Sequence, residues 1–90
     1  MFESVRNWLA LRRQREFAIR RALQHFQQSR CLHPMGGHVL RVSASEAIVR
    51  VMFVTNRVPP DRAWFAVSLV GDTIRELSFD DVEAFELPWR

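Results

Sequence analysis

The chain contains no tyrosine and no lysine, and its 90 residues include one cysteine and three glycines. The single cysteine, Cys31, excludes an internal disulfide and is typical of a reducing compartment. The longest nearly apolar stretch, residues 63–70, is far shorter than a membrane span. Glu3 precedes every cation, so the N-terminal residues lack the pattern of a secretory signal. These absences predict a cytoplasmic protein with no membrane partner.

Because lysine is absent, all 13 basic side chains are arginines, and they are unevenly distributed. Residues 1–30 carry seven Arg against two Glu, and residues 71–90 carry six carboxylates against two Arg. The local balances are +5, then +2 for residues 31–70, then −4, which sum to the net charge of +3. A chain polarised in this way can satisfy its charges on itself or on a second copy. Net charge alone is therefore weak evidence for an external anionic partner.

The length of the chain predicts a single domain over residues 1–90 with a modest hydrophobic core. Hydrophobic residues nevertheless make up 48% of the chain, including three Trp and seven Phe. Such content is typical of a globular fold and leaves apolar surface uncovered. We therefore expect a homodimer or another homo-oligomer, or a protein partner.

Residues 1–30 are predicted to form one long helix, because helix-favouring residues dominate and the first proline is Pro34. Apolar residues recur on one helical face at Val5, Trp8, Leu9, Ile19, Ala22, Leu23 and Phe26. Charged residues interrupt this face at Arg12, Arg15 and Glu16. Either the helix bends there, or its first turns leave the domain and only the segment from Phe17 to Phe26 packs on a sheet. Phe17 points away from the apolar face, which suggests that a partner covers it.

Residues 31–38 are expected to form a loop, in which Gly36 and Gly37 supply the positive φ angles of a turn. Residues 39–79 have the composition of four antiparallel strands, at 39–44, 47–55, 62–70 and 73–79, with a tight hairpin turn at Gly71-Asp72. In the C-terminal tail, residues 80–90, Ser78 and Asp81 favour a short capped helical turn. A fifth edge strand at 82–87 is the alternative.

These elements predict an α+β fold, with one long N-terminal helix packed on a four-stranded antiparallel β-meander and a possible short C-terminal helical turn. The opposite sheet face carries Trp64 and Ala66, which is apolar enough for sheet-to-sheet dimerisation. The stretch Val70-Gly71-Asp72-Thr73-Ile74-Arg75-Glu76-Leu77 resembles a hairpin common in nuclear-transport-factor-like folds, and the element order also resembles cystatin-like folds. The first resemblance implies a small-ligand or catalytic domain, although this chain has one long helix where that family has a cone of three.

A metal site is conceivable in the loop that contains Cys31, His33 and His38. These residues would give three of the ligands that zinc prefers. The alternative, which we favour, is a polar loop with an unpaired thiol, so we expect no metal and no other cofactor. A thiol at a helix C-terminus faces the wrong end of the dipole to become a nucleophile. The carboxylates near the C-terminus are explained by capping, so we expect no enzyme.

Nucleic-acid binding is a second functional class, because an arginine-rich helix can follow phosphates. The basic residues of the expected helix lie all around it rather than on one stripe, at Arg12, Arg13, Arg15, Arg20 and Arg21. No phosphate-binding glycine loop or helix-turn-helix spacing accompanies them. The alternative is a solvated cationic surface answered by the acidic end of the chain.

The interpretation that we favour is a small non-catalytic protein-interaction or assembly module. Tryptophan and arginine are the residues that most often contribute binding energy at interfaces. The candidate partner-binding residues are Trp8, Leu9, Arg12, Arg13, Arg15, Trp64 and Trp89. Core packing would explain Trp64 well and Trp89 poorly, because Trp89 lies at the extreme C-terminus beside Pro88.

Overall fold

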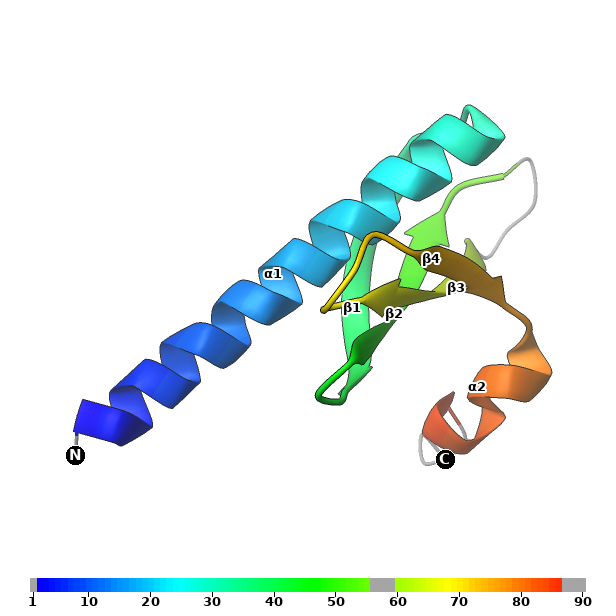
Figure 1. Cartoon of the computed structure of the whole chain (residues 1–90). Coiled ribbons are helices and arrows are strands. Elements are labelled where there is room, and N and C mark those ends of the chain that lie inside the picture. The colour runs from blue at the N-terminus through cyan, green and yellow to red at the C-terminus, as the bar shows by residue number, and fades with distance from the viewer. Residues whose placement is uncertain (1, 56–59, 87–90) are drawn as a thin grey trace.

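The computed structural model of the chain describes residues 2–55 and 60–86, with side chains from Leu9 onward. The elements follow in the order α1 (Phe2–Arg30), β1 (Pro34–Val42), β2 (Glu46–Phe53), β3 (Asp61–Ser68), β4 (Ile74–Leu77) and α2 (Phe79–Glu86). The four strands form one antiparallel sheet in the order β1-β2-β3-β4 (Figure 1). The predicted α+β fold, a long helix on an antiparallel meander with a short C-terminal helix, is therefore confirmed.

Helix α1 is a single helix of 29 residues whose two halves have different surroundings. Every residue from Leu9 to Phe17 is exposed, whereas Ala18, Ala22 and Phe26 are fully buried at successive turns. Figure 1 shows the helix running straight past the sheet, with its N-terminal half clear of the strands. Of the two alternatives for the interrupted apolar face, the helix does not bend, and its first turns leave the sheet.

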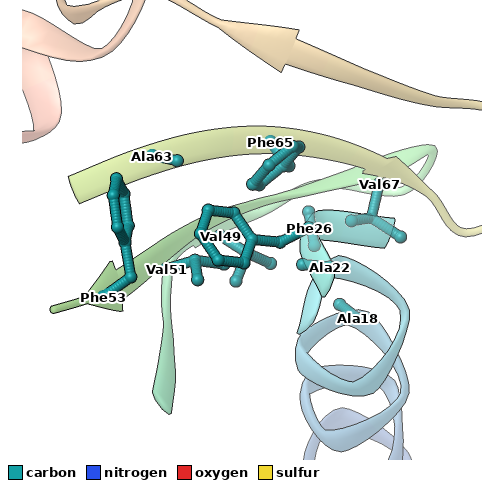
Figure 2. Close-up of a cluster of buried hydrophobic side chains, with 10 residues drawn as sticks. Ala18, Ala22, Phe26, Val49, Val51, Phe53, Ala63, Phe65 and Val67 are labelled. Atoms are coloured by element: carbon teal, nitrogen blue, oxygen red, sulfur yellow. The ribbon is translucent and has the colours of Figure 1, made fainter. Parts of the chain in front are cut away.

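The hydrophobic core lies between the second half of α1 and the inner face of the sheet. Phe26 contacts Phe53 with a centroid separation of 4.8 Å and meets Phe65 edge-on at 6.4 Å. The strand residues that surround it alternate along β2 and β3, as one face of a sheet requires. The buried strand residues of this cluster are Ala47, Val49, Val51, Phe53, Ala63, Phe65 and Val67 (Figure 2).

The connection from α1 to β1 differs from the expected loop. The helix ends at Arg30, and Cys31 takes a left-handed φ of 54° while its N–H donates to the Gln27 carbonyl at 2.9 Å. Strand β1 already begins at Pro34, so the predicted loop at 31–38 is wrong from residue 34 onward.

The role predicted for Gly36 and Gly37 is also wrong, because no glycine among the described residues has a positive φ. A Cβ on Gly37 would lie 3.0 Å from the Ile19 Cγ2 atom, whereas a Cβ on Gly36 would meet nothing within 4 Å. A side chain at position 37 would therefore press on Ile19, because α1 approaches β1 closely there.

Helix α2 packs on the outer face of the sheet. Ser78 and Asp81 cap it as predicted: the Asp81 carboxylate accepts bonds from the Ser78 N–H at 2.9 Å and from the Ser78 hydroxyl at 3.0 Å. The alternative of a fifth strand at 82–87 is wrong over its described residues 82–86, which are helical. Val82 is fully buried against Ile48 and Ala66.

The expectation that the outer sheet face is open for sheet-to-sheet dimerisation is therefore wrong where α2 covers it. The predicted two-residue turn at Gly71-Asp72 is also wrong, because residues 69–73 connect β3 to β4. Within this connection the Ser68 hydroxyl accepts a hydrogen bond from the Gly71 N–H at 2.9 Å.

Candidate interaction surfaces

The projecting half of α1 presents apolar side chains to solvent. Leu9 and Phe17 are each 40% exposed and Leu11 is 48% exposed. Residues spaced three or four apart share one side of a helix, so Leu9, Arg13, Phe17 and Arg20 form a continuous row. All four are exposed, and we call this row the outer stripe. It alternates apolar and cationic side chains on the side of α1 that faces away from the sheet, so the expectation that Leu9 shares the face of Ala22 and Phe26 is wrong.

The arginines of the projecting half have different surroundings. Among the described residues, Arg13, Arg15 and Arg20 take part in no ion pair. Arg12 is paired with Glu16, one turn later, at 3.3 Å. Arg12 and Arg15 line a shallow hollow of about 360 Å³ together with Leu11 and Glu16. Because residues two apart do not share a helix face, Arg15 lies on a different side from Arg13.

The docked half of α1 uses its arginines within the chain. The Arg21 guanidinium donates to the Asp72 carbonyl at 2.8 Å and lies 5.7 Å from the centroid of the Phe17 ring. Arg30 pairs with Glu76 of β4. The basic and acidic ends of the chain therefore meet along the β3–β4 hairpin, as the charge pattern of the sequence allows. The two arginines of the outer stripe take no part in these ion pairs.

A second charged surface lies on α2. The exposed side of this helix carries Phe79, Asp80, Glu83 and Ala84, which we call the acidic α2 face. Phe79 is 46% exposed, and Asp80 and Glu83 take part in no ion pair among the described residues. Asp81 is held by the cap, where the Ser78 N–H, and secondarily the Ser78 hydroxyl, lower its pKa by hydrogen bonding to the charged form.

Trp64 lies beneath α2 and is not an open anchor for a partner. Its indole N–H donates to the Glu86 carboxylate at 2.9 Å, and the Arg50 guanidinium lies 3.2 Å from the same carboxylate. The Glu86 side chain is only 6% exposed, so this pair is a largely buried contact that holds the end of α2 on the sheet. Glu86 and Arg50 are not among the residues predicted from the sequence. The register of β2 with β3 would have indicated Arg50, because it places this residue directly opposite Trp64.

A hollow of about 330 Å³ lies between α2 and the end of the sheet that holds the β1–β2 turn. Its charged lining consists of Arg41 and Arg75 together with Glu46 and Asp81, so the formal charges cancel. Arg75 is paired with Glu46 at 3.5 Å, and Arg41 lies over the ring of Phe85. Each of these charged groups, including the capping Asp81, already has a contact within the chain, which makes the hollow a weak candidate for the small-ligand site that the family resemblance implies.

The candidate metal ligands do not form a site. Cys31 is exposed at the end of α1, and His33 contacts the Gln27 amide at 3.4 Å. His38 lies in β1 opposite Arg50. Among the described residues, no three His, Cys, Asp or Glu side chains lie close enough together to hold a metal ion.

The remaining candidates fall partly outside the described part of the chain. The side chain of Trp8 and the whole of Trp89 lie outside it. No helix in residues 2–55 and 60–86 has the length and hydrophobicity needed to span a membrane. Comparisons of the chain with protein-family models, curated proteins and solved structures gave no match. The outer stripe of α1 and the acidic α2 face are therefore the two surfaces that indicate what the protein does.

Proposed function

We propose that this chain is a small non-catalytic protein-interaction or assembly module that acts in the cytoplasm and binds through the projecting half of α1. The observation that carries the proposal is the run of nine exposed residues, from Leu9 to Phe17, in a helix that continues beyond its own sheet. An isolated helical segment of this length is marginal in water, because packing supplies most helix stability. A partner that buries Leu9 and Phe17, which share one side of the helix, would supply that packing.

The composition of the segment supports a protein partner. Exposed leucine and phenylalanine alternate with arginines, and Arg is enriched at protein interfaces while its neighbours provide apolar area. Surface apolar residues scattered singly need no explanation, but here they share one helix within three turns. The segment therefore has the features of a helix that packs against an apolar surface with acidic residues around it.

The positions of the carboxylates support a non-catalytic role. Paired catalytic carboxylates need a pocket in which the pKa of one is raised. Asp81 instead caps a helix with a lowered pKa, and Glu86 is engaged by Trp64 and Arg50. The exposed free thiol of Cys31 is consistent with a reducing compartment.

A photo-crosslinking residue at Leu9, introduced in the cells that make the protein, tests the proposal. The matched control is the same residue at Gln28, which is exposed on the docked half of the same helix. We expect a discrete protein adduct from position 9 and none from position 28. A nucleic-acid adduct whose yield falls steeply with salt would instead support the alternative of nucleic-acid binding. Equal adducts from both positions, or none from either, would contradict the proposal.

A further inference from the structure

The proposed function leaves the partner unidentified, and the charges of the chain point to one. We infer, on the basis of that proposed function, that the outer stripe binds the acidic α2 face of a second copy of this chain. The stripe offers Arg13 and Arg20 beside Leu9 and Phe17, and the face offers Asp80 and Glu83 beside Phe79. Each surface therefore combines exposed apolar area with charge that the other surface complements.

The unpaired charges make the two surfaces complementary. Within the described part of the chain, none of Arg13, Arg20, Asp80 and Glu83 belongs to an ion pair, whereas Arg21, Arg30 and Glu86 are paired. The protomer thus leaves cations along one surface and anions along another. Complementary potentials of this kind steer association and fix which surfaces meet.

One protomer cannot join these two surfaces to each other. Helix α1 packs on the sheet face that carries Val49 and Phe65, whereas α2 packs on the face that carries Ile48 and Ala66. Alternate residues of a strand point to opposite faces, so the two helices lie on opposite sides of the sheet. The outer stripe also points away from the sheet. An acidic surface for it must therefore come from another molecule.

Contact between two outer stripes is disfavoured, because it would place arginines against arginines. The favoured contact joins unlike surfaces. Each copy either offers its stripe to one neighbour and its α2 face to another, which is a heterologous interface, or exchanges both contacts with a single neighbour, which is an isologous one. Ala84 is exposed on the α2 face beside Glu83, and its small side chain allows a second helix to approach closely. Phe17 and Phe79 then provide the apolar contact of the pair.

Charge reversal tests this contact through the mass of the full chain in solution, measured by sedimentation velocity over a concentration series. We expect the wild type to associate at low salt and to dissociate as salt rises. Reversing the stripe (Arg13→Glu with Arg20→Glu) or the face (Asp80→Arg with Glu83→Arg) should each weaken association at least about tenfold. Mixing the two reversed proteins, or combining all four changes in one chain, should restore it.

The matched control is Gln28→Glu, which adds a negative charge at an exposed position on the docked half of the same helix. This control should leave the dissociation constant within about threefold of the wild-type value. Arg13→Glu alone should raise the dissociation constant by more than that. An arginine at position 80 would lie at the positive end of the α2 dipole and would destabilise the helix. The neutral pair Asp80→Asn with Glu83→Gln, which avoids this repulsion, is therefore measured too. Circular dichroism verifies that each variant is folded.

Three results would overturn the inference: a wild type that is monomeric at every concentration, reversed variants that associate as well as the wild type, or a mixture that stays monomeric. If the wild type is monomeric while the crosslink from Leu9 reaches a different protein, the second copy is the wrong partner and the proposed function still holds. If both experiments give nothing, the proposed function fails as well.

Discussion

Two phenylalanines lie in the two halves of α1: Phe26 in the docked half, which packs on the sheet, and Phe17 in the projecting half, which we propose binds a partner. Phe26 is fully buried, and its ring contacts Phe53 at a centroid separation of 4.8 Å and Phe65 at 6.4 Å. Phe17 lies nine residues earlier and is 40% exposed, with the guanidinium of Arg21 over its ring. The same substitution, Phe→Ala, therefore has very different expected effects at the two positions.

The loss from Phe26→Ala combines the transfer free energy of a whole aromatic side chain with the cavity left behind, about 3–5 kcal/mol of the free energy of unfolding. Phe17→Ala removes a side chain that is already partly solvated and one cation–π contact at the surface, so we expect about 1 kcal/mol or less. Urea denaturation followed by circular dichroism, at a protein concentration below any self-association, measures both. Equal losses at the two positions would refute the division of α1 into a docked half and a projecting half.

Three further predictions concern the packing of the two helices. Gly37→Ala should lower the free energy of unfolding by about 1 kcal/mol, because its Cβ would meet α1 at 3.0 Å, whereas Gly36→Ala should be neutral or slightly stabilising in the same denaturation experiment. Glu86→Ala should cost about 3 kcal/mol, since it removes the largely buried carboxylate that accepts from the Trp64 indole N–H and pairs with Arg50, and a loss under 1 kcal/mol would mean that these contacts do not hold α2. The pKa of Asp81 is lowered in the folded protein, so its stabilising contribution is complete above its ordinary pKa and is lost as pH falls through the folded value. The melting temperature of Asp81→Asn should therefore lie below that of the wild type at pH 6 and approach it as the pH is lowered below the ordinary pKa of an aspartate, about 3.9; an unchanged gap would contradict the cap.

The sequence was sufficient where local physics decides the outcome. The interruption of the apolar face by Arg12 and Arg15 left two alternatives, a bend in the helix or first turns that leave the sheet, and the structure has the second. Ser78 and Asp81 form the predicted cap because a capping box depends on residues three apart. Leu9 and Arg13 are exposed one turn apart on the same stripe, and their contact with a partner stays a prediction.

The sequence was insufficient where contacts depend on distant parts of the chain. Gly37 was interpreted as a turn residue, because nothing local shows that Ile19 lies above it. Trp64 was interpreted as a partner anchor, because its hydrogen bond to Glu86 exists only when α2 folds back onto the sheet. The acidic α2 face as a defined surface likewise depends on which side of that helix Val82 buries.

Backbone hydrogen exchange of α1, measured across a dilution series of the wild type, tests most directly whether residues 9–17 form a contact between molecules. An unsupported helical segment opens readily, whereas one packed against another molecule is protected. We expect the amides of residues 9–17 to be protected in concentrated solution and to lose that protection on dilution, while those around Ala22 and Phe26 stay protected throughout. Protection of residues 9–17 that does not change with concentration, or that is absent even in the most concentrated sample, would contradict the account of this segment as the contact between copies of the chain.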